Sequence, residues 1–548
     1  MYSQAMKSNL ISCFLRITYK ERLENFCFTI CKVANSYKMR IASEMNIFFN
    51  LTSQAVGDFS IEVLNQLITR YKTEELYVVH FSINNGNELK LIQKPKECYS
   101  YEDMVRAEYN NYLYAKVCPP VDKDLIDNMK GYEPEIIKMM ERFSRMHDFA
   151  LDYDSRIRMY HSHIRYWNYL LDRANMGVAV FINVPHEVYD YIIYCLCKVK
   201  NIPTAISYPG HPSGYRYFFH DIKLHCSELI QTYQHLRKDY ESLSIDEIVL
   251  PEDFQKAFEL YSDCKSDKTP YYMKREYFGS KKESIIKRVV RLPKKIQREG
   301  TEYIKIRAKY TKQCLEQRIK YHDREKVIKS EFDKSMKVYD ELSVEMNLSE
   351  KYIYLPLHYE PECAVNPLGD VYLHQYLVAE MLSFYLPDNV KLYVKEHPVQ
   401  GKYGFTFFKS QQFFRNLSKR DNIRLINRNE DTYKLLENCV AVASVTGTAG
   451  FEGMFMEKPF LIFGYHINMF APGAFAIRNN KDCEDAIDFI LKYGAKHTLK
   501  DMKIYLKALS EVEVYCSIWE PLVSVSVEEN IKRIKEGYEK VIDAQLEL

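Results

Sequence analysis

Short apolar runs alternate with amphipathic stretches along most of the chain. In the first half, the apolar runs are four to six residues long and rich in Val, Ile and aromatic residues, which is typical of buried strands. Strands are predicted at 46–50, 76–81, 178–183 and 204–207, and helices at 61–70, 133–146, 155–175 and 187–200. Strand, polar loop and helix in repetition indicate a parallel sheet, with ligands at the carboxyl ends of the strands.

The second half repeats this alternation more regularly. Strands are predicted at 352–357, 390–396, 423–426, 440–444 and 459–463, and helices at 372–385, 407–417, 432–438 and 449–456. Five strands with four intervening helices predict a Rossmann-like domain. The chain is therefore expected to be an α/β protein with two Rossmann-like domains.

The pattern divides the chain into five parts. Because Met39 and Met45 directly precede the first strand, residues 1–44 are interpreted as an N-terminal extension. The predicted parts are this extension at 1–44, a first Rossmann-like domain at 45–230, a helical connecting segment at 231–345, a second Rossmann-like domain at 346–510 and C-terminal helices at 511–548.

The connecting segment is strongly basic. Residues 281–334 contain eighteen Lys or Arg against eight Asp or Glu, and 284–292 separates apolar from basic residues on two faces of a helix. A basic amphipathic helix of this kind can lie on an anionic membrane surface. A solvated helical hairpin is the other interpretation, so peripheral membrane contact stays an open prediction.

Composition excludes several functional classes. A net charge of +2 over 548 residues gives no electrostatic footprint for nucleic acid. Fourteen cysteines lie without a Cys-x2-Cys pair or zinc-type Cys/His spacing, which favours a reduced, cytoplasmic protein without a metal site. No apolar run approaches the length of a membrane-spanning helix, and residues 1–37 are not expected to be a signal peptide.

A Ser/Thr/Gly-rich turn joins the fourth strand of the second domain to a helix. It reads Ser-Val-Thr-Gly-Thr-Ala-Gly-Phe-Glu at 444–452. Glycines allow close approach of a ligand, and the N-terminus of a helix favours a phosphate. Its predicted ligand-binding residues are Thr446 and Thr448 as hydroxyl donors, Gly447 and Gly450 in the backbone, and Glu452 as an acceptor for ribose hydroxyls.

Two more polar loops leave neighbouring strands at the same predicted edge. Lys-Glu-His-Pro at 395–398 ends the second strand, so that Lys395 and His397 are expected beside the turn at 444–452. Leu-Pro-Leu-His-Tyr-Glu-Pro-Glu at 355–362 leaves the first strand and brings His358 and Glu362 to this edge. Neutral or charged imidazoles can donate a hydrogen bond to a phosphate oxygen.

These three motifs resemble those of the bacterial capsule polysaccharide biosynthesis glycosyltransferases, the family that holds the capsular β-Kdo transferases. The family's Pro-Leu-His…Pro-Glu, Lys-Glu-His-Pro, Ser-x-Thr-Gly-Thr-x-Gly-x-Glu and Lys-Pro motifs are similar to residues 356–362, 395–398, 444–452 and 458–459. The chain departs at Glu360, where relatives are expected to have glutamine. The resemblance is specific over 352–464 and weak elsewhere.

The resemblance implies a GT-B fold, in which two Rossmann-like domains face each other across a cleft. It places the nucleotide sugar in the second domain and the acceptor in the first. In related families a His-Pro motif contacts the phosphate of a CMP-activated sugar. His397 and the turn hydroxyls are then expected to hold the leaving CMP without a cofactor or divalent metal.

Glycosyl transfer also needs a carboxylate, acting as general base or as nucleophile. It should face the donor from the first domain. Glu187, in the loop between the strand at 178–183 and the following helix, is the first candidate, with His186 beside it. The alternatives are Asp58, Asp154, Asp190 and Asp221.

The sequence thus predicts a cytoplasmic glycosyltransferase, near the inner face of the inner membrane, with a CMP-activated acidic sugar of the Kdo or sialic-acid type as donor. The acceptor would be a capsule or surface glycan, or a glycolipid. Three alternatives remain open: a CDP-glycerol-type polymer transferase, an enzyme like UDP-GlcNAc 2-epimerase, and a non-catalytic capsule assembly or export protein.

Overall fold

The computed structural model describes most of the chain after residue 44. The described residues are 45–51, 58–80, 90–143, 152–223, 226, 228–263, 316, 319, 322–360, 362–398, 400, 408–518, 522 and 524–546. The predicted N-terminal extension and the amphipathic stretch 284–292 lie outside them.

The first domain is built on a seven-stranded sheet in the order β13-β6-β5-β4-β1-β2-β3. Strands β1 to β5 are parallel, whereas β6 pairs antiparallel with β5 and with β13. The strands are β1 (Asn46–Leu51), β2 (Leu76–His80), β3 (Glu97–Ser100), β4 (Met176–Phe181), β5 (Thr204–Pro209), β6 (Tyr215–Phe219) and β13 (Val514–Tyr515). Strands β1 and β4 are almost wholly buried, so their apolar runs are those of strands covered on both faces.

Helices cover both faces of this first sheet. Trp167 of α6 lies fully buried against Phe48 of β1, with ring centroids 5.4 Å apart, whereas Ile534 of α19 packs in the core of the other face. The helices are α2 (Asp58–Arg70), α3 (Tyr101–Arg106), α4 (Lys123–Met129), α5 (Glu133–Met139), α6 (Tyr153–Arg173), α7 (Tyr189–Val199), α8 (Glu228–Asp239), α9 (Glu252–Ser262) and α19 (Val527–Leu546), with the short 3-10 helices η2 (Met140–Phe143) and η4 (Ile245–Glu247).

The second domain is built on a six-stranded, fully parallel sheet in the order β12-β11-β10-β7-β8-β9. Its strands are β7 (Lys351–Pro356), β8 (Val390–Lys395), β9 (Ile423–Ile426), β10 (Ala441–Ser444), β11 (Phe460–Ile462) and β12 (Ala474–Ala476). Its helices are α12 (His322–Leu342), α13 (Gln375–Tyr385), α14 (Gln411–Ser418), α15 (Thr432–Asn438), α16 (Thr448–Met454), α17 (Asn480–Tyr493) and α18 (Leu499–Val512), with the 3-10 helices η5 (Asp370–Leu373) and η6 (Ile467–Phe470). The predicted α/β class with two Rossmann-like sheets is confirmed.

Some predicted boundaries are corrected. The helix predicted at 407–417 begins at Gln411, because Ser410 is its N-cap and accepts a hydrogen bond from the N–H of Phe413 at 3.2 Å. The helix predicted at 372–385 is divided into η5 and α13, since His374 between them has a non-helical backbone. The sequence pattern missed the short strands β3, β6, β12 and β13.

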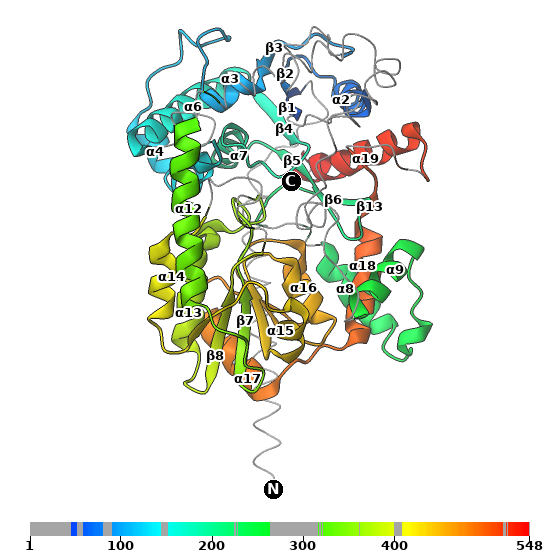
Figure 1. Cartoon of the computed structure of the whole chain (residues 1–548). Coiled ribbons are helices and arrows are strands. Elements are labelled where there is room, and N and C mark those ends of the chain that lie inside the picture. Colours follow the sequence, from blue (N-terminus) through cyan, green and yellow to red (C-terminus); the bar gives the residue numbers. More distant parts are fainter. Residues whose placement is uncertain are drawn as a thin grey trace, which may run out of the picture.

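The end of the chain returns to the first domain. Figure 1 shows α19, in red, beside the first sheet, although it follows the second domain in sequence. Val514 of β13 pairs with Arg216 of β6, and the hydroxyl of Tyr538 on α19 donates to the carbonyl oxygen of Phe181 at 3.1 Å. The predicted C-terminal helices at 511–548 therefore include a strand and complete the first domain.

The carboxyl edges of the two sheets face each other (Figure 1). Tyr208, at the end of β5, lies 3.7 Å by its hydroxyl from the sulfur of Cys363, in the loop after β7. His211, which follows β5, stacks on Phe451 of α16 with ring centroids 5.7 Å apart. This is the arrangement predicted for a GT-B fold, with loops of both domains meeting where ligands bind to parallel sheets.

Candidate functional site

The strand order of each sheet reverses at one place. In the second sheet the chain runs from β7 through β8 to β9 and then returns to β10, on the other side of β7. In the first sheet the corresponding reversal lies between β1 and β4. Ligands of open α/β sheets bind at such switch points. The loops with His358 and with Thr446 flank the switch point of the second sheet, and the loop with Glu187 flanks the switch point of the first sheet.

His358 joins the two loops at the switch point of the second sheet. Its Nε2 accepts a hydrogen bond from the backbone N–H of Thr446 at 3.1 Å and lies 2.9 Å from the hydroxyl oxygen of Ser444. Burial lowers the pKa of His358 to about 3, and the charge of Lys409 adds to this effect. The ring is therefore neutral at pH 7, and because Nε2 accepts, the ring proton lies on Nδ1.

The predicted turn residues are largely engaged in holding the turn together. The hydroxyl of Thr446 donates to the carbonyl oxygen of Ala364 at 2.7 Å, and the N–H of Gly447 donates to the hydroxyl of Ser444 at 3.2 Å. A Cβ at Gly447 would lie 2.6 Å from that hydroxyl and 3.4 Å from the ring of His358. Gly447 thus allows the imidazole to reach the turn.

Helix α16 presents the remaining predicted residues of the turn. Thr448 is its first residue and is exposed, whereas Glu452 is half-buried in its second turn. A Cβ at Gly450 would lie 2.2 Å from the ring of Phe460, so this glycine allows α16 to pack closely on β11. The structure therefore gives Gly450 a packing role, and its predicted contact with a ligand stays a prediction.

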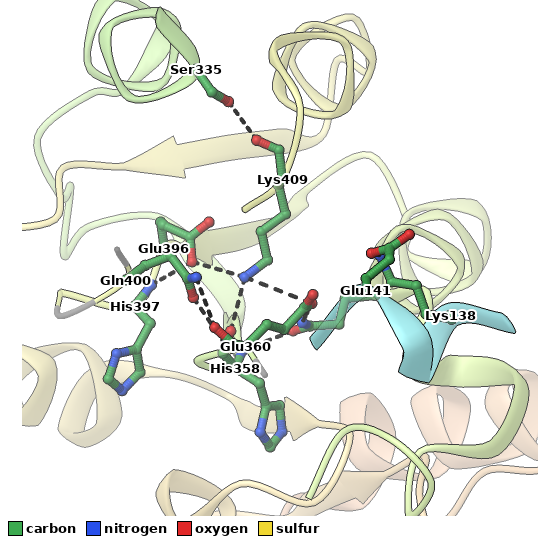
Figure 2. Close-up of polar contacts among 10 residues, drawn as sticks. Lys138, Glu141, Ser335, His358, Glu360, Glu396, His397, Gln400 and Lys409 are labelled. Atoms are coloured by element: carbon green, nitrogen blue, oxygen red, sulfur yellow. Dashed lines mark hydrogen bonds and ion pairs between the residues drawn. The ribbon is translucent and has the colours of Figure 1, made fainter. Parts of the chain in front are cut away.

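The two predicted basic residues at the end of β8 lie in different surroundings. Lys395 is buried and its ammonium donates to the carbonyl oxygen of Glu430 and to the hydroxyl of Thr432, the latter at 2.9 Å. Burial lowers its pKa to about 8. His397 lies near the ring of Tyr359, with centroids 5.7 Å apart, and burial lowers its pKa to about 4. His397 and His358 point to the same side in Figure 2, whereas Lys395 supports the start of α15.

Glu362 lies where the two domains meet. It lines a small interdomain pocket together with Arg142 and Lys138 of the first domain. Burial raises the pKa of Glu362, and the charge of Arg142 opposes this rise. Arg142 also donates to the carbonyl oxygen of Asn366 at 3.0 Å, and Asn366 donates through its amide to the carbonyl oxygen of Glu135 at 3.0 Å. The loop of Glu362 is thus fixed against the first domain.

The predicted catalytic pair lies in the loop after β4. Tyr101 donates to Glu187 at 3.1 Å, and Nε2 of His186 lies 3.5 Å from the other carboxylate oxygen of Glu187. Nδ1 of His186 lies 2.6 Å from the carbonyl oxygen of Val184, so Nδ1 carries the ring proton. Burial lowers the pKa of His186, and the charge of Arg142 contributes.

The backbone directly after Glu187 is strained. Val188 has a φ of 63°, a left-handed conformation that a β-branched residue rarely adopts. Such strain persists only where surrounding contacts enforce it, and it occurs often at functional sites. The strain lies directly beside Glu187, and the catalytic role of Glu187 stays a prediction.

The alternative carboxylates have other surroundings. Asp190 is fully buried, and burial raises its pKa to about 7; it accepts a hydrogen bond from the N–H of Glu187 at 2.6 Å and so holds the Glu187 loop. Asp154 is exposed on α6 and pairs with Arg158. Asp221 accepts from the hydroxyl of Tyr194 at 3.2 Å, away from the switch point. The side chain of Asp58 lies outside the described residues.

Two residues of the site escaped the sequence patterns. Arg142 lies in a stretch predicted as plain helix, and Lys409 lies in a segment predicted as helix that is in fact the connection before α14. The available signal was local: Lys409 stands between Phe408 and a serine typical of a helix N-cap. A lysine beside aromatic residues at the start of a helix suggests a buried charge, but its partners cannot be inferred from sequence spacing.

No group of three or more His, Cys, Asp or Glu side chains among the described residues is arranged to hold a metal ion. Within those residues, none of the helices combines the length and the apolar character needed to cross a bilayer.

The second domain matches a known family. The family model described as "Capsule polysaccharide biosynthesis protein" matches residues 246–471. This range contains all three predicted loops, at 355–362, 395–398 and 444–452, whereas Glu187 and His186 lie outside it. The predicted resemblance to capsule polysaccharide biosynthesis proteins is confirmed over this range. No curated protein sequence matches the chain.

Several solved structures are similar in part. KpsC of Thermosulfurimonas dismutans, a beta Kdo 2,7 transferase, is 17% identical to this chain, with a TM-score of 0.22. The match covers 38% of this chain and 61% of the KpsC chain. UDP-GlcNAc 2-epimerase of Methanocaldococcus jannaschii is 10% identical over 86% of this chain and 99% of its own, with a TM-score of 0.24. A glycosyltransferase of Rickettsia africae is 11% identical over 91% of this chain and 99% of its own, with a TM-score of 0.24.

Proposed function

We propose that the protein is a glycosyltransferase that moves an acidic sugar, of the Kdo or sialic-acid type, from CMP to a capsule or surface glycan or glycolipid acceptor. One observation carries the proposal: three loops with the motifs of the capsule family meet at the switch point of the second sheet, where His358 bonds to Thr446. A parallel sheet binds its ligand at this place.

The donor half of the proposed site suits a single phosphate. Burial keeps His358 and His397 neutral, so they would offer N–H donors to the leaving CMP without adding full charges. Exposed Thr448 adds a hydroxyl at the start of α16. Glu452, one turn further along the helix, would accept from the ribose hydroxyls.

The acceptor half would supply the proton chemistry. In an inverting reaction, Glu187 would take the proton of the acceptor hydroxyl as its oxygen bonds to the anomeric carbon. The bond between that carbon and the phosphate oxygen breaks, and CMP leaves. In a retaining reaction, Glu187 would be the nucleophile. Arg142, near His186 and Glu362, is a suitable partner for the carboxylate of an acidic sugar.

The proposal includes a cytoplasmic location at the inner face of the membrane. It rests on the basic composition of 281–334, most of which lies outside the described residues. Binding of the full chain to vesicles with and without anionic lipid tests this part separately from catalysis.

The test of the proposed activity compares three kinds of donor. CMP release from CMP-Kdo or CMP-sialic acid, in the presence of capsule oligosaccharide, should exceed nucleotide release from CDP-glycerol and from UDP-GlcNAc. Turnover with CDP-glycerol alone would indicate a polymer transferase, and epimerisation of UDP-GlcNAc without an acceptor would indicate an epimerase. CMP binding without turnover on any acceptor would indicate a non-catalytic assembly or export role.

A further inference from the structure

One buried lysine connects the two histidine loops of the proposed donor site. The side chain of Lys409 is 4% exposed. Its ammonium donates to the carbonyl oxygen of His358 at 2.8 Å and to the carboxylate of Glu396 at 3.0 Å, and it lies 4.0 Å from Glu360 (Figure 2). A single cation thus contacts the loop after β7 and the loop after β8.

Glu396 links Lys409 to the backbone of His397. Its carboxylate is fully buried, and the same oxygen that accepts from Lys409 accepts from the backbone N–H of His397 at 2.8 Å. The N–H of Glu396 itself donates to the hydroxyl of Tyr339 at 2.9 Å. A buried carboxylate without a cation is costly, so the ammonium of Lys409 is needed to keep Glu396 in this position.

The loop of His358 is held by an equivalent set of contacts. The side chain of Gln375 accepts from the N–H of His358 at 2.7 Å and donates to Glu360 at 2.6 Å. Gln400 bonds to the backbone of Glu360 in both directions, each at 3.0 Å. The contacts of both loops therefore converge on Lys409. The carbonyl oxygen of Lys409 in turn accepts a hydrogen bond from the hydroxyl of Ser335 on α12.

The network lies behind the histidine rings. In Figure 2 the rings of His358 and His397 point away from the ammonium of Lys409, toward the same side. Lys409 therefore contacts the backbone or the neighbour of each histidine, not the rings themselves. A group in this position determines where the two imidazole rings lie without contacting their ligand.

We infer that Lys409 is a positioning residue, which fixes the loops of His358 and His397 relative to each other so that both rings can contact one phosphate of the donor. The inference rests on the proposed function, since it assigns the rings to that phosphate. Misplacement of a reacting or binding group by about 1 Å can weaken its effect about 100-fold. Loss of Lys409 should therefore weaken CMP binding by about 10- to 100-fold.

The first measurement is CMP binding by titration calorimetry. Lys409→Met should weaken binding as stated, whereas Glu396→Gln, which keeps an acceptor for both Lys409 and His397, should change it less than about 3-fold. Lys503→Met is the matched control: Lys503 is equally buried and donates to the carbonyl oxygen of Ile245 at 2.9 Å, outside the three donor loops. Unchanged CMP affinity in folded Lys409→Met would overturn the inference.

The second measurement needs no ligand and separates this inference from the proposed function. Histidine titrations by NMR on the free protein should show a shift in one variant only. Lys409→Met removes a positive charge near both rings and should raise the pKa of His358 and His397. Glu396→Gln should leave both nearly unchanged, because burial raises the pKa of Glu396 and its carboxyl is already neutral where the rings titrate. Lys395, the other charged group near His397, is unchanged in both variants.

Each outcome of the two measurements has a defined meaning. If the wild type binds no CMP while the histidine shifts appear, the network is confirmed and the proposed donor is wrong. If Lys409→Met does not fold, Lys409→Gln decides, because its neutral amide keeps a hydrogen-bond donor at this position: unshifted histidine titrations together with unchanged CMP affinity in that variant would contradict the link between Lys409 and the two loops.

Discussion

The imidazole of His358 accepts the backbone N–H of Thr446 at 3.1 Å, and this bond crosses the switch point of the second sheet. The two residues are far apart in sequence and follow different strands, β7 and β10. Their bond holds two of the three predicted donor loops in contact. The integrity of the proposed site therefore depends on a neutral, buried histidine at this position.

Replacement of His358 by phenylalanine should destabilise the protein by about 1–3 kcal/mol, because the buried N–H of Thr446 loses its acceptor. The pKa of His358 is lowered in the folded state, so its contribution is complete above the unfolded value of 6.5 and is lost as pH falls from 6.5 toward about 3. Urea unfolding of wild type and variant at several pH values checks this. A stability difference that grows as pH falls would contradict the assigned neutral state.

Replacement of Gly450 by alanine tests whether this glycine serves packing or a ligand. A Cβ would meet the ring of Phe460 at 2.2 Å, so the variant should lose about 1–3 kcal/mol of stability through overpacking. Gly131→Ala is the control, since its Cβ would meet no atom within 4 Å. Unchanged stability with weakened CMP binding would assign Gly450 to the ligand instead.

The contact between the domains should weaken as pH rises. The carboxyl of Glu135 in the first domain lies near that of Asp370 in the second, which also pairs with Lys223 at 2.9 Å. Burial, with Asp370 nearby, raises the pKa of Glu135 from 4.5 to about 8. Its stabilising contribution is complete below 4.5 and is lost as pH rises to about 8, because the ionised carboxylate is disfavoured in the folded state.

Glu135→Gln keeps the hydrogen-bonding shape and removes this titration. The melting temperature of the variant should therefore fall less than that of the wild type between pH 5 and pH 8. Differential scanning calorimetry on both proteins in matched buffers gives the comparison. Parallel curves over this range would show that Glu135 is not protonated at the domain interface.

Glu187→Gln should lower the transfer rate by at least about 100-fold, the lower end of the contribution of a general base. CMP binding should persist, because Glu187 lies in the first domain. Asp154→Asn is the control: its exposed pair with Arg158 contributes little, so transfer should be unchanged. Full activity in Glu187→Gln would move the catalytic role to another carboxylate, with Asp190 the next to test.

The periodic part of the fold was predictable from the sequence. Strand β9 (Ile423–Ile426) and helix α15 (Thr432–Asn438) agree with the predicted ranges, because each has a clear apolar pattern and Asp431 is an N-cap side chain. The pairing of β13 with β6 was not predictable. It is a two-residue contact between segments about 300 residues apart, and no local pattern encodes such a contact.

The site was predictable as three loops but not as a network. Because the carboxyl ends of parallel strands lie at one edge of a sheet, the sequence places His358, His397 and Thr446 at that edge. The structure brings their loops together there. Lys409 acts through a carbonyl oxygen and a neighbouring carboxylate, and these contacts depend on how the connection before α14 packs. Sequence spacing carries no information about such packing, so the residue that links the loops emerged only from the structure.

The most direct test of the proposed function is thermal stabilisation by CMP, CDP and UDP in the wild type and in His397→Ala. Preferential binding of CMP should raise the melting temperature more than CDP or UDP does, and His397→Ala should lose most of this stabilisation while it unfolds near the wild-type temperature without nucleotide. No stabilisation by CMP, or the same stabilisation in His397→Ala, would contradict a CMP-sugar site at these loops.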